Sequence, residues 1–258
     1  MQRRVNDAVW AGDRRVAAYA SRVLRPVEVV ILARYRDGLT GRILEIGAGA
    51  GRLTGYLAEL ATSTHGIDVS AAMVAVSRGR YPRATFAVAD LRDAAAYRGA
   101  PYDAIVAPFN VLDVVDDDDR RVALGRIHGA LRPGGLLVMS SHNRAAGDRR
   151  ADPLRLARGS LREMVASIVR LPRRRRNHRR LSAYERNEPS YAILNDVEHD
   201  YSVLHYYIHR DAQVAQLEEH GFEVLDVLDL EGHSVGPGDS SDDPELHYVA
   251  RRREPAGG

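Results

Sequence analysis

Cysteine and lysine are both missing from this sequence of 258 residues. Without cysteine the chain can form no disulfide, no zinc–thiolate site and no iron–sulfur cluster. Without lysine it cannot carry the Gly-x-x-x-x-Gly-Lys-Ser/Thr loop that holds nucleotide phosphates. A cysteine-free chain is compatible with the reducing cytosol, and we expect a cytoplasmic protein.

Long hydrophobic runs are missing as well, because no stretch reaches the roughly 20 apolar residues that cross a bilayer. Residues 1–6 are polar and no apolar leader follows, so neither a membrane anchor nor a signal peptide is expected. The formal net charge is only +2, which does not by itself indicate nucleic acid. Hydrophobic residues make up 45% of the chain, enough for the core of one α/β domain with a cap.

A glycine-rich turn follows a short apolar run at residues 43–46, and we interpret the rest of the sequence around it. Gly47, Gly49 and Gly51 stand at alternate positions. A helical pattern begins directly afterwards, with these apolar residues on one face: Leu53, Tyr56, Leu57 and Leu60. Glycine lets a ligand approach the bare backbone, and a helix N-terminus offers N–H groups to a carboxylate or phosphate. Strand, turn and helix together predict a small-ligand site.

The spacing of these glycines separates two classes of nucleotide-binding protein. The dinucleotide fingerprint is Gly-x-Gly-x-x-Gly/Ala, and its third slot here holds Arg52 or Thr54, so an NAD site is a weak interpretation. Residues 44–51 resemble the first motif of class I S-adenosylmethionine-dependent methyltransferases of the small-molecule type, since they read LEIGAGAG. A tight strand–helix turn of another α/β protein is the alternative at this point.

Strand and helix patterns alternate over residues 41–142, which predicts a Rossmann-like, doubly wound, mostly parallel α/β sheet. With the strands of the C-terminal part, we expect seven strands. Helical rhythms at 16–24 and 26–35 precede the sheet. The expected parts are an N-terminal helical cofactor cover (1–40), a cofactor-binding core (41–142), an Arg-rich cap inserted after the fifth strand (143–198), a substrate-facing strand with the completion of the sheet (199–254) and a disordered tail (255–258).

Three carboxylates follow or lie in successive predicted strands, and their spacing strengthens the resemblance. Asp68 ends the second strand, where an acid can accept both ribose hydroxyls of a nucleoside, although NAD enzymes use the same device. The resemblance implies that Asp90 lies beside the adenine amino group and that Glu45 faces the methionine amino group. A solvated loop carboxylate is the alternative for each acid alone. The agreement of all three with the glycine turn favours the cofactor.

The resemblance therefore implies that S-adenosyl-L-methionine is the cofactor and S-adenosyl-L-homocysteine the product. Tyr19, on the apolar face of the first helix, is a candidate for contact with it, with a plain core aromatic as the alternative. Phe109 and Asn110 end the fourth strand and match the motif that meets the methionine part, with Asn110 pointing at the reaction centre. The cofactor-binding residues expected in full are Tyr19, Glu45, Gly47, Ala48, Gly49, Asp68, Val69, Met73, Asp90, Leu91, Phe109 and Asn110.

Two motifs of related methyltransferases are missing from this sequence, and their absence limits the acceptors and metals that we expect. Enzymes that methylate DNA adenine carry Asp/Asn-Pro-Pro-Tyr/Phe after the fourth strand, whereas residues 107–110 read APFN here, which argues against a nucleobase amine. Catechol-type enzymes hold Mg²⁺ with an acid and a further Asp-Asn pair. That pair is missing, and Asp113 alone does not make a hard-cation site, so no metal is expected.

Histidines are the candidates for proton transfer, because a neutral hydroxyl or a protonated amine needs a base when it is methylated. His142 follows the fifth strand at the sheet edge where ligands bind. Residues 201–209 read as a strand whose polar face we place toward the substrate. The catalytic candidates are His142, His205 and Asn110, and the substrate-binding candidates are Tyr201, His205 and Tyr207. A structural histidine or an ordinary edge strand with a wet face is the alternative.

The inserted segment holds 13 arginines between Arg144 and Arg180. We expect one amphipathic helix inside it, ended by Pro172. The charges can belong to a solvated flexible loop, bind an acidic small substrate through bidentate pairs, or follow RNA phosphates.

The sequence thus predicts an S-adenosylmethionine-dependent methyltransferase acting on O or N of a small molecule, such as a secondary metabolite or a sugar. The alternatives are an RNA methyltransferase guided by the basic insertion and a regulatory protein that binds the cofactor without turnover. The expected partner is a small-molecule methyl acceptor, with neither nucleic acid nor membrane, and a homodimer is the assembly considered.

Overall fold

The structure of the chain is a computed structural model that describes residues 23–146 and 160–254. Residues 16–22 of the helix expected over 16–24, its candidate cofactor contact Tyr19, and the tail 255–258 lie outside the described residues. Val23 and Leu24 are described and are not helical. No helix in the described part is both long enough and apolar enough to span a bilayer.

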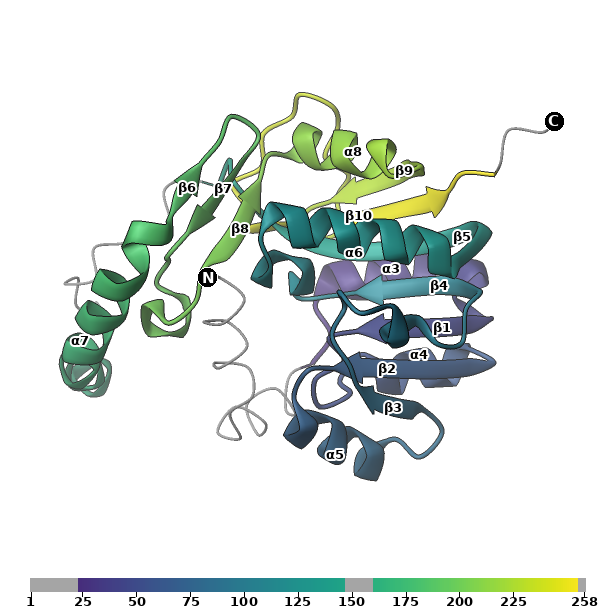
Figure 1. Cartoon of the computed structure of the whole chain (residues 1–258), viewed down its shortest axis with the longest axis horizontal. Helices are drawn as coiled ribbons and strands as arrows, with labels where there is room; N and C mark the ends of the chain where they lie inside the picture. The colour runs from purple at the N-terminus through teal and green to yellow at the C-terminus, as the bar shows by residue number, and fades with distance from the viewer. Residues whose placement is uncertain (1–22, 147–159, 255–258) are drawn as a thin grey trace.

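A parallel sheet forms the centre of the fold (Figure 1). Its strands lie in the order β3 (Thr85–Val88), β2 (Ser63–Asp68), β1 (Arg42–Ile46), β4 (Tyr102–Ala107) and β5 (Leu131–Asn143). The chain winds outward from β1 in one direction and from β4 in the other. The carboxyl ends of β1 and β4 therefore meet at a switch point, where α/β proteins bind ligands. The expected Rossmann-like, doubly wound fold is confirmed.

Further strands extend the sheet beyond β5. β10 (Glu245–Arg252) pairs with β5, and β9 (Phe222–Leu228) pairs with β10, both antiparallel. At the end of β5 an extension adds β8 (His205–Ile208), β7 (Tyr191–Leu194) and β6 (Arg186–Asn187). The described residues thus form one ten-stranded sheet, and the expected number of seven is wrong. β6 and β7 have only two and four residues, too short for a periodic pattern to reveal them.

Strand β5 belongs to both parts of the sheet. Its middle pairs with β4, whereas its last two residues, His142 and Asn143, lie opposite Tyr207 and Ile208 of β8. Strand β8 is shorter than expected, because Glu198–Tyr201 form a 3₁₀ turn, η6, in place of its first residues.

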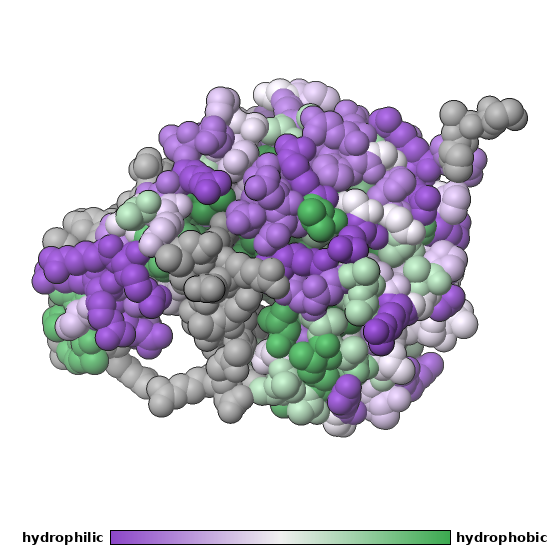
Figure 2. All heavy atoms as spheres, viewed as in Figure 1, coloured by the Kyte–Doolittle hydropathy of each residue, from purple (hydrophilic) through white to green (hydrophobic). Residues whose placement is uncertain are grey.

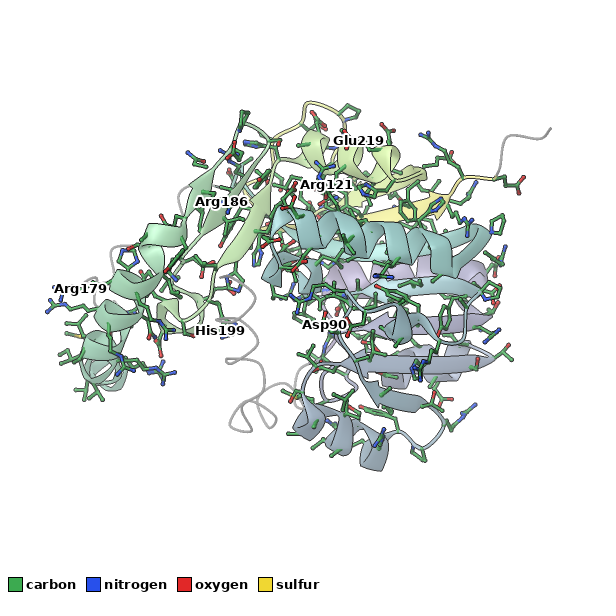
Figure 3. All side chains as sticks on the ribbon, viewed as in Figure 1. Asp90, Arg121, Arg179, Arg186, His199 and Glu219 are labelled. Atoms are coloured by element: carbon green, nitrogen blue, oxygen red, sulfur yellow. The ribbon has the colours of Figure 1, made fainter. Side chains whose placement is uncertain are left out.

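Helices cover both faces of the parallel sheet (Figure 1). One face carries α3 (Pro26–Arg34) and α4 (Thr54–Leu60), and the other carries α6 (Asp117–Ala130) and α8 (Arg210–Glu219). Alternate residues of β1 enter different cores, since Ile43 packs with α3 and α4 while Leu44 packs with α6. Glu45 therefore faces the side of α3 and α4. On the other side, Arg121 Nη1 of α6 lies 2.9 Å from Glu219 Oε2 of α8 (Figure 3).

Polar side chains accept hydrogen bonds from backbone N–H groups at the starts of two helices. Ser70 accepts a hydrogen bond from the Met73 N–H at the start of α5 (Ala71–Arg80). Asp116 accepts one from the Asp119 N–H, at 3.1 Å, at the start of α6. The acids that follow Asp116 lie in the first turn, where they suit the positive end of the helix dipole.

Helix α7 (Leu161–Leu181) projects beside the sheet extension (Figure 1). Its surface is hydrophilic in one part and hydrophobic at the end of the helix where Val165, Ile168 and Val169 are exposed (Figure 2). Pro172 lies inside this helix, so the expected helix end there is wrong. An interior proline costs roughly 3 kcal/mol. The second half packs against η6 and buries Asn177 and Leu181, which offsets that cost. Six of the arginines lie in this half and are helical, so the interpretation of a flexible loop is wrong for them.

Candidate functional site

A cavity of about 490 Å³ lies at the carboxyl ends of β1, β2 and β4 and reaches the end of β5. Its volume is within the range of small-molecule sites, and its position is the switch point of the sheet. One end is formed by the glycine turn and the loops after β2 and β3. The other end is formed by His142, Glu198, His199 and His205, from β5, η6 and β8.

The glycine turn gives the cavity a wall of bare backbone. Gly47 and Gly49 have φ of +69° and +55°, which favour glycine. A Cβ on Gly47 would lie 2.5 Å from Val111 Cγ2. A Cβ on Gly49 would be 4.0 Å from Gly47 O, the nearest atom among the described residues other than its chain neighbours. Gly49 thus leaves open space beside the cavity that it lines.

Asp68 holds this turn in place. Its carboxylate accepts hydrogen bonds from the backbone N–H of Gly49 at 2.9 Å and of Ser70 at 2.8 Å. Burial raises the pKa of Asp68, although the two N–H groups act against the rise. Asp68 lines the cavity beside an apolar end made of Val69, Met73, Ala89 and Leu91.

Asp90 does not line the cavity, although its neighbours Ala89 and Leu91 do. Its carboxylate accepts hydrogen bonds from the backbone N–H and the guanidinium of Arg92, which also lies 3.1 Å from Asp119 Oδ2. Figure 3 shows Asp90 on the core side of the molecule, away from His199 of the extension. Nothing in the spacing of the sequence indicates the pairing with Arg92.

Glu45 is buried at the base of the glycine turn and accepts a hydrogen bond from Thr54 Oγ1. Burial raises the pKa of Glu45 to about 8, although the Thr54 hydroxyl and Arg52 act against the rise. Arg52, next in the chain after the glycines, makes a bidentate pair with Glu28 of α3, with N–O distances of 2.6 and 2.7 Å. This pair ties α3 to the turn.

Two residues after β4 have left-handed backbone, with φ of 53° at Phe109 and 54° at Asn110. Such a conformation costs of order 1–3 kcal/mol per residue and is concentrated at functional sites. It places the Phe109 ring between two guanidinium groups, since Cζ of Arg25 and Cζ of Arg52 each lie 4.3 Å from its centroid. All three side chains line the cavity, and the two guanidinium groups are also paired with carboxylates, Arg25 with Glu245 and Arg52 with Glu28.

Asn110 lines the cavity and has a side-chain acceptor that is not satisfied. Its backbone N–H donates to Ser140 Oγ at 2.8 Å and its Nδ2 donates to Glu245 Oε2 at 2.9 Å. No donor among the described residues reaches its buried Oδ1. Burial alone would raise the pKa of Glu245, but His247, Arg25 and Asn110 lower it to about 2. A ligand amino or hydroxyl group is suited to satisfy Oδ1.

His142 is backed by a buried pair of opposite charges. Its backbone N–H donates to Asp113 Oδ2 at 2.6 Å, and its Nδ1 lies 2.8 Å from the same oxygen without good hydrogen-bond alignment. Asp113 also accepts from Arg120, and both side chains are fully buried. Burial lowers the pKa of His142, but Asp113 and the more distant Glu198 and Asp196 raise it more.

His205 is backed in the same way by a second buried carboxylate. Its Nδ1 lies 2.8 Å from Asp196 Oδ2, which also accepts from the Tyr207 hydroxyl at 2.5 Å. Burial raises the pKa of Asp196, but His205 and Tyr207 lower it more. Nδ1 of each imidazole therefore lies close to a buried aspartate.

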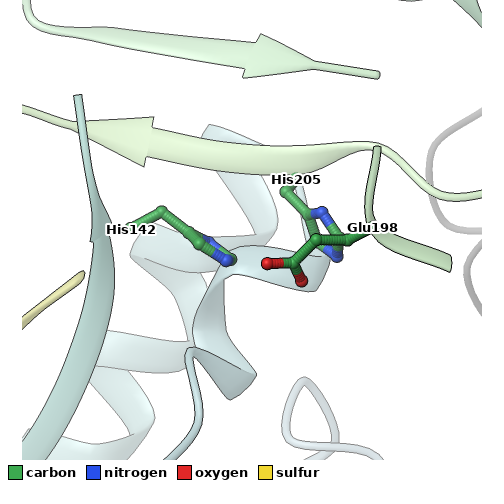
Figure 4. Close-up of side chains that lie close together, drawn as sticks. All are labelled: His142, Glu198 and His205. Carbon is green, nitrogen blue, oxygen red and sulfur yellow. The ribbon is translucent and has the colours of Figure 1, made fainter. Parts of the chain in front are cut away.

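The two imidazoles converge with Glu198 (Figure 4). The ring centroids of His142 and His205 lie 5.0 Å apart. One potential ligand atom of each of the three residues lies within 4.8 Å of those of the others, and Glu198 is exposed while the histidines are buried.

The turn that carries Glu198 has unusual backbone. His199, Asp200 and Tyr201 all have positive φ, between 53° and 58°. Helix α7 supports it, since Asn177 Nδ2 donates to Asp200 O at 2.9 Å. From the other side, Asn195 Nδ2 donates to Tyr201 O at 3.0 Å. The inserted helix therefore positions the far end of the cavity.

The central part of the chain also matches a known protein family. Residues 43–135 match the family model described as "Methyltransferase domain", which covers the glycine turn, Asp68 and Asn110. This part of the chain is a methyltransferase domain. The family that the glycine turn predicts is thus confirmed for residues 43–135. Among curated proteins, none matches the chain.

Solved structures of methyltransferases share the fold over nearly the whole chain. The CcbJ methyltransferase from Streptomyces caelestis has a TM-score of 0.60 at 16% identity and covers 95% of this chain and 98% of its own. The glycopeptide N-methyltransferase MtfA complexed with S-adenosyl-L-methionine has a TM-score of 0.57 at 19% identity, covering 91% and 96%. CalS10, an amino pentose methyltransferase from Micromonospora echinaspora, has a TM-score of 0.55 at 17% identity, covering 92% and 95%. At such identities the likeness shows the fold alone.

Most of the predicted site residues line the cavity, but three described ones do not. The predicted residues that line it are Glu45, Gly47, Ala48, Gly49, Asp68, Val69, Met73, Leu91, Phe109, Asn110, His142 and His205. Asp90, Tyr201 and Tyr207 do not. The face expected for Tyr201 is wrong because this residue lies in the turn and not in β8; its ring packs on His178 and under Arg174 of α7. Tyr207 lies behind His205 and reaches Asp196 instead.

Several cavity residues were not found from the sequence. Arg52 directly follows the glycine motif, so its position was the one available signal. The others come from segments far from the motif and carry no local pattern: Arg25, Glu198, His199 and Glu245.

Proposed function

We propose that this protein transfers a methyl group from S-adenosyl-L-methionine to O or N of a small molecule. The observation that carries the proposal is one cavity with two unlike ends. The open glycine turn with Asp68 forms the first end, and His142 with His205 forms the second. Methyl transfer needs a donor site and an acceptor site that share one space.

The first end suits the cofactor by its donor set and its shape. Asp68 would accept the ribose hydroxyls, and the open space at Gly49 would admit the nucleoside against the backbone. Val69, Met73 and Leu91 would cover the adenine ring. The guanidinium groups of Arg25 and Arg52 suit a carboxylate. The amide oxygen Asn110 Oδ1, which lacks a donor among the described residues, suits an amino group.

When bound, S-adenosyl-L-methionine supplies an electrophilic methyl group on its sulfonium. The residues of this chain would align the acceptor with it and exclude water, and alignment alone can lower a barrier by several kcal/mol. His142 and His205, each held by an aspartate, would activate the acceptor beside Asn110. The catalytic roles predicted for these three residues remain part of the proposal.

Two of the structural neighbours support a small-molecule acceptor. MtfA is a glycopeptide N-methyltransferase, and CalS10 methylates an amino pentose and was solved with bound S-adenosylmethionine. The end of the cavity at His142 and Glu198 offers polar groups to such an acceptor. The cytoplasm remains our expectation for the location.

Calorimetry with the purified chain tests the cofactor. S-adenosylmethionine and S-adenosylhomocysteine should bind, and NAD should bind at least a hundredfold more weakly; preference for NAD overturns the proposal. Incubation with methyl-labelled cofactor and either a small-molecule extract or bulk RNA then tests the acceptor class. Label in the small-molecule fraction is expected, and label in RNA alone would favour an RNA acceptor.

A further inference from the structure

The acceptor end of the cavity gathers three side chains that commonly bind metal ions. His142, His205 and Glu198 come from three different elements, yet they offer ligand atoms within 4.8 Å of one another (Figure 4). Two imidazoles and one carboxylate with open positions are a recurring donor set for divalent transition metals. Bonds of about 2.0–2.2 Å need the donors somewhat closer together, and the exposed Glu198 side chain can turn to meet that need.

The surroundings of the histidines are those of metal ligands. A metal-bound histidine almost always directs its other ring nitrogen at a carboxylate or carbonyl, which fixes the ring and raises its basicity. Here Asp113 Oδ2 lies 2.8 Å from His142 Nδ1, and Asp196 Oδ2 lies 2.8 Å from His205 Nδ1. Both aspartates are themselves held, by Arg120 and by the Tyr207 hydroxyl. Two independent aspartate–histidine pairs facing one point are hard to explain as packing.

The third ligand is fixed by its backbone. The Glu198 N–H donates to Asp196 Oδ1 at 2.9 Å, so one aspartate orders both His205 and Glu198. The three residues after Glu198 have left-handed backbone, which persists only where the surroundings enforce it. The charges at this end favour a cation. Asp113, Asp196 and Glu198 lie beside the imidazoles, and Arg120 forms an ion pair with Asp113.

We propose that His142, His205 and Glu198 bind one divalent transition-metal ion, such as Zn²⁺, Mn²⁺ or Co²⁺. The proposal differs from the expectation drawn from the sequence, which was that no metal binds. With three protein ligands the ion keeps open positions toward the cavity, as in catalytic rather than structural sites.

The role of the ion rests on the function proposed above, whereas its binding does not. An acceptor hydroxyl that enters an open position becomes more acidic and releases its proton to solvent water. Its oxygen lone pair forms the new bond to the methyl carbon, and the carbon–sulfur bond breaks with its electron pair going to sulfur. His142 and His205 then act by holding the ion, and no proton passes through them.

Metal titration of the full, tag-free chain tests the site without any acceptor. After treatment with a chelator, Zn²⁺ is added in a calorimeter and Co²⁺ is followed by its visible absorption. One ion per chain should bind, and Glu198→Gln and His205→Gln should each weaken binding at least tenfold. Asp196→Asn should weaken it about 10–100-fold, because outer partners of metal ligands have effects of that size. His233→Gln, at an exposed histidine paired with Asp229, is the matched control and should bind as the wild type does.

The outcomes separate this proposal from the methyltransferase function. If His205→Gln fails to fold, the exposed Glu198→Gln variant decides. No binding below millimolar metal, or equal affinity of wild type and Glu198→Gln, overturns the metal site. S-adenosylhomocysteine binding is measured on the same samples. If the wild-type protein binds S-adenosylhomocysteine but no metal, the metal site alone is overturned. If it binds metal but not S-adenosylhomocysteine, the proposed function alone is overturned.

Discussion

The rings of His142 and His205 lie with their centroids 5.0 Å apart, although the first lies one residue before the end of β5 and the second begins β8. Each ring turns one nitrogen toward its own buried aspartate. This relationship gives the far end of the cavity its chemistry and leads to the first prediction.

His142→Gln and His205→Gln should slow methyl transfer at least a hundredfold while changing the affinity for S-adenosylhomocysteine less than threefold. The reason is that both side chains contact the acceptor end and neither holds the glycine turn. Single-turnover rates and calorimetry measure the two quantities. If cofactor affinity falls as much as the rate does, these histidines belong to the cofactor site instead.

Asp68→Ala should weaken binding of S-adenosylmethionine and S-adenosylhomocysteine at least tenfold. Each charged hydrogen bond to a ribose hydroxyl contributes roughly 1.5–3 kcal/mol, and the variant also frees the Gly49 N–H. Asp90→Asn is the comparison, because the Asp90 carboxylate is bound by Arg92 outside the cavity wall. Its effect on affinity should be smaller than that of Asp68→Ala; the reverse order would place the adenine contact at Asp90.

Arg52→Met should destabilise the protein by about 3–5 kcal/mol, because it leaves Glu28 buried without its partner. Replacing both residues, as Arg52→Met with Glu28→Leu, should recover much of the loss. Urea unfolding of the two single variants and the double variant measures the coupling. Additive effects would show that the bidentate pair does not hold α3 to the glycine turn.

Glu45 should make stability fall as the pH rises. Burial raises its folded-state pKa to about 8 from the ordinary value of 4.5, so between these values the unfolded chain has released a proton that the folded chain keeps. The free energy of unfolding then decreases by at most about 1.4 kcal/mol per pH unit in this window and is flat outside it. Glu45→Gln removes the effect. Its stability relative to wild type should therefore rise from pH 5 to pH 8 in urea titrations, and a constant difference would contradict the shifted pKa.

Asn177→Ala should raise the KM for the acceptor about fivefold or more and leave cofactor affinity unchanged. The variant removes a buried hydrogen bond worth about 1–3 kcal/mol that supports the turn after Glu198. Arg179→Ala, at an exposed position of the same helix, is the control and should change neither quantity. An unchanged KM in Asn177→Ala would mean that α7 does not position the acceptor.

The cofactor end could be predicted from the sequence because its determinants are local. Gly47, Gly49 and Asp68 belong to one strand–turn–helix–strand passage, where a φ above zero and an acid after a strand leave clear signals. The doubly wound, mostly parallel sheet was predicted from the alternation of strand and helix patterns.

The acceptor end could not be predicted because its contacts join distant segments. Asp113 lies after β4 and holds His142 at the end of β5, and Glu245 of β10 holds Asn110. His199 and Tyr201 have left-handed backbone although neither is glycine, so the sequence gives no signal of a turn here. The alternating pattern therefore predicts a strand through this turn, which is wrong. Likewise Pro172 predicts a helix end, because the local sequence does not show how the residues after it pack against the rest of the protein.

The length of β5 has a consequence for how this protein could change its substrate. A single continuous strand fixes how far His142 stands from the glycine turn, because its middle pairs with β4 and its last residues pair with β8. Two residues added to it would shift the histidine by about 6.6 Å, at 3.3 Å of rise per residue. Substitutions in the segment that follows β5 would instead change which acceptor is methylated, while the distance from His142 to the glycine turn stays the same. New acceptors could then arise without a change in cofactor binding.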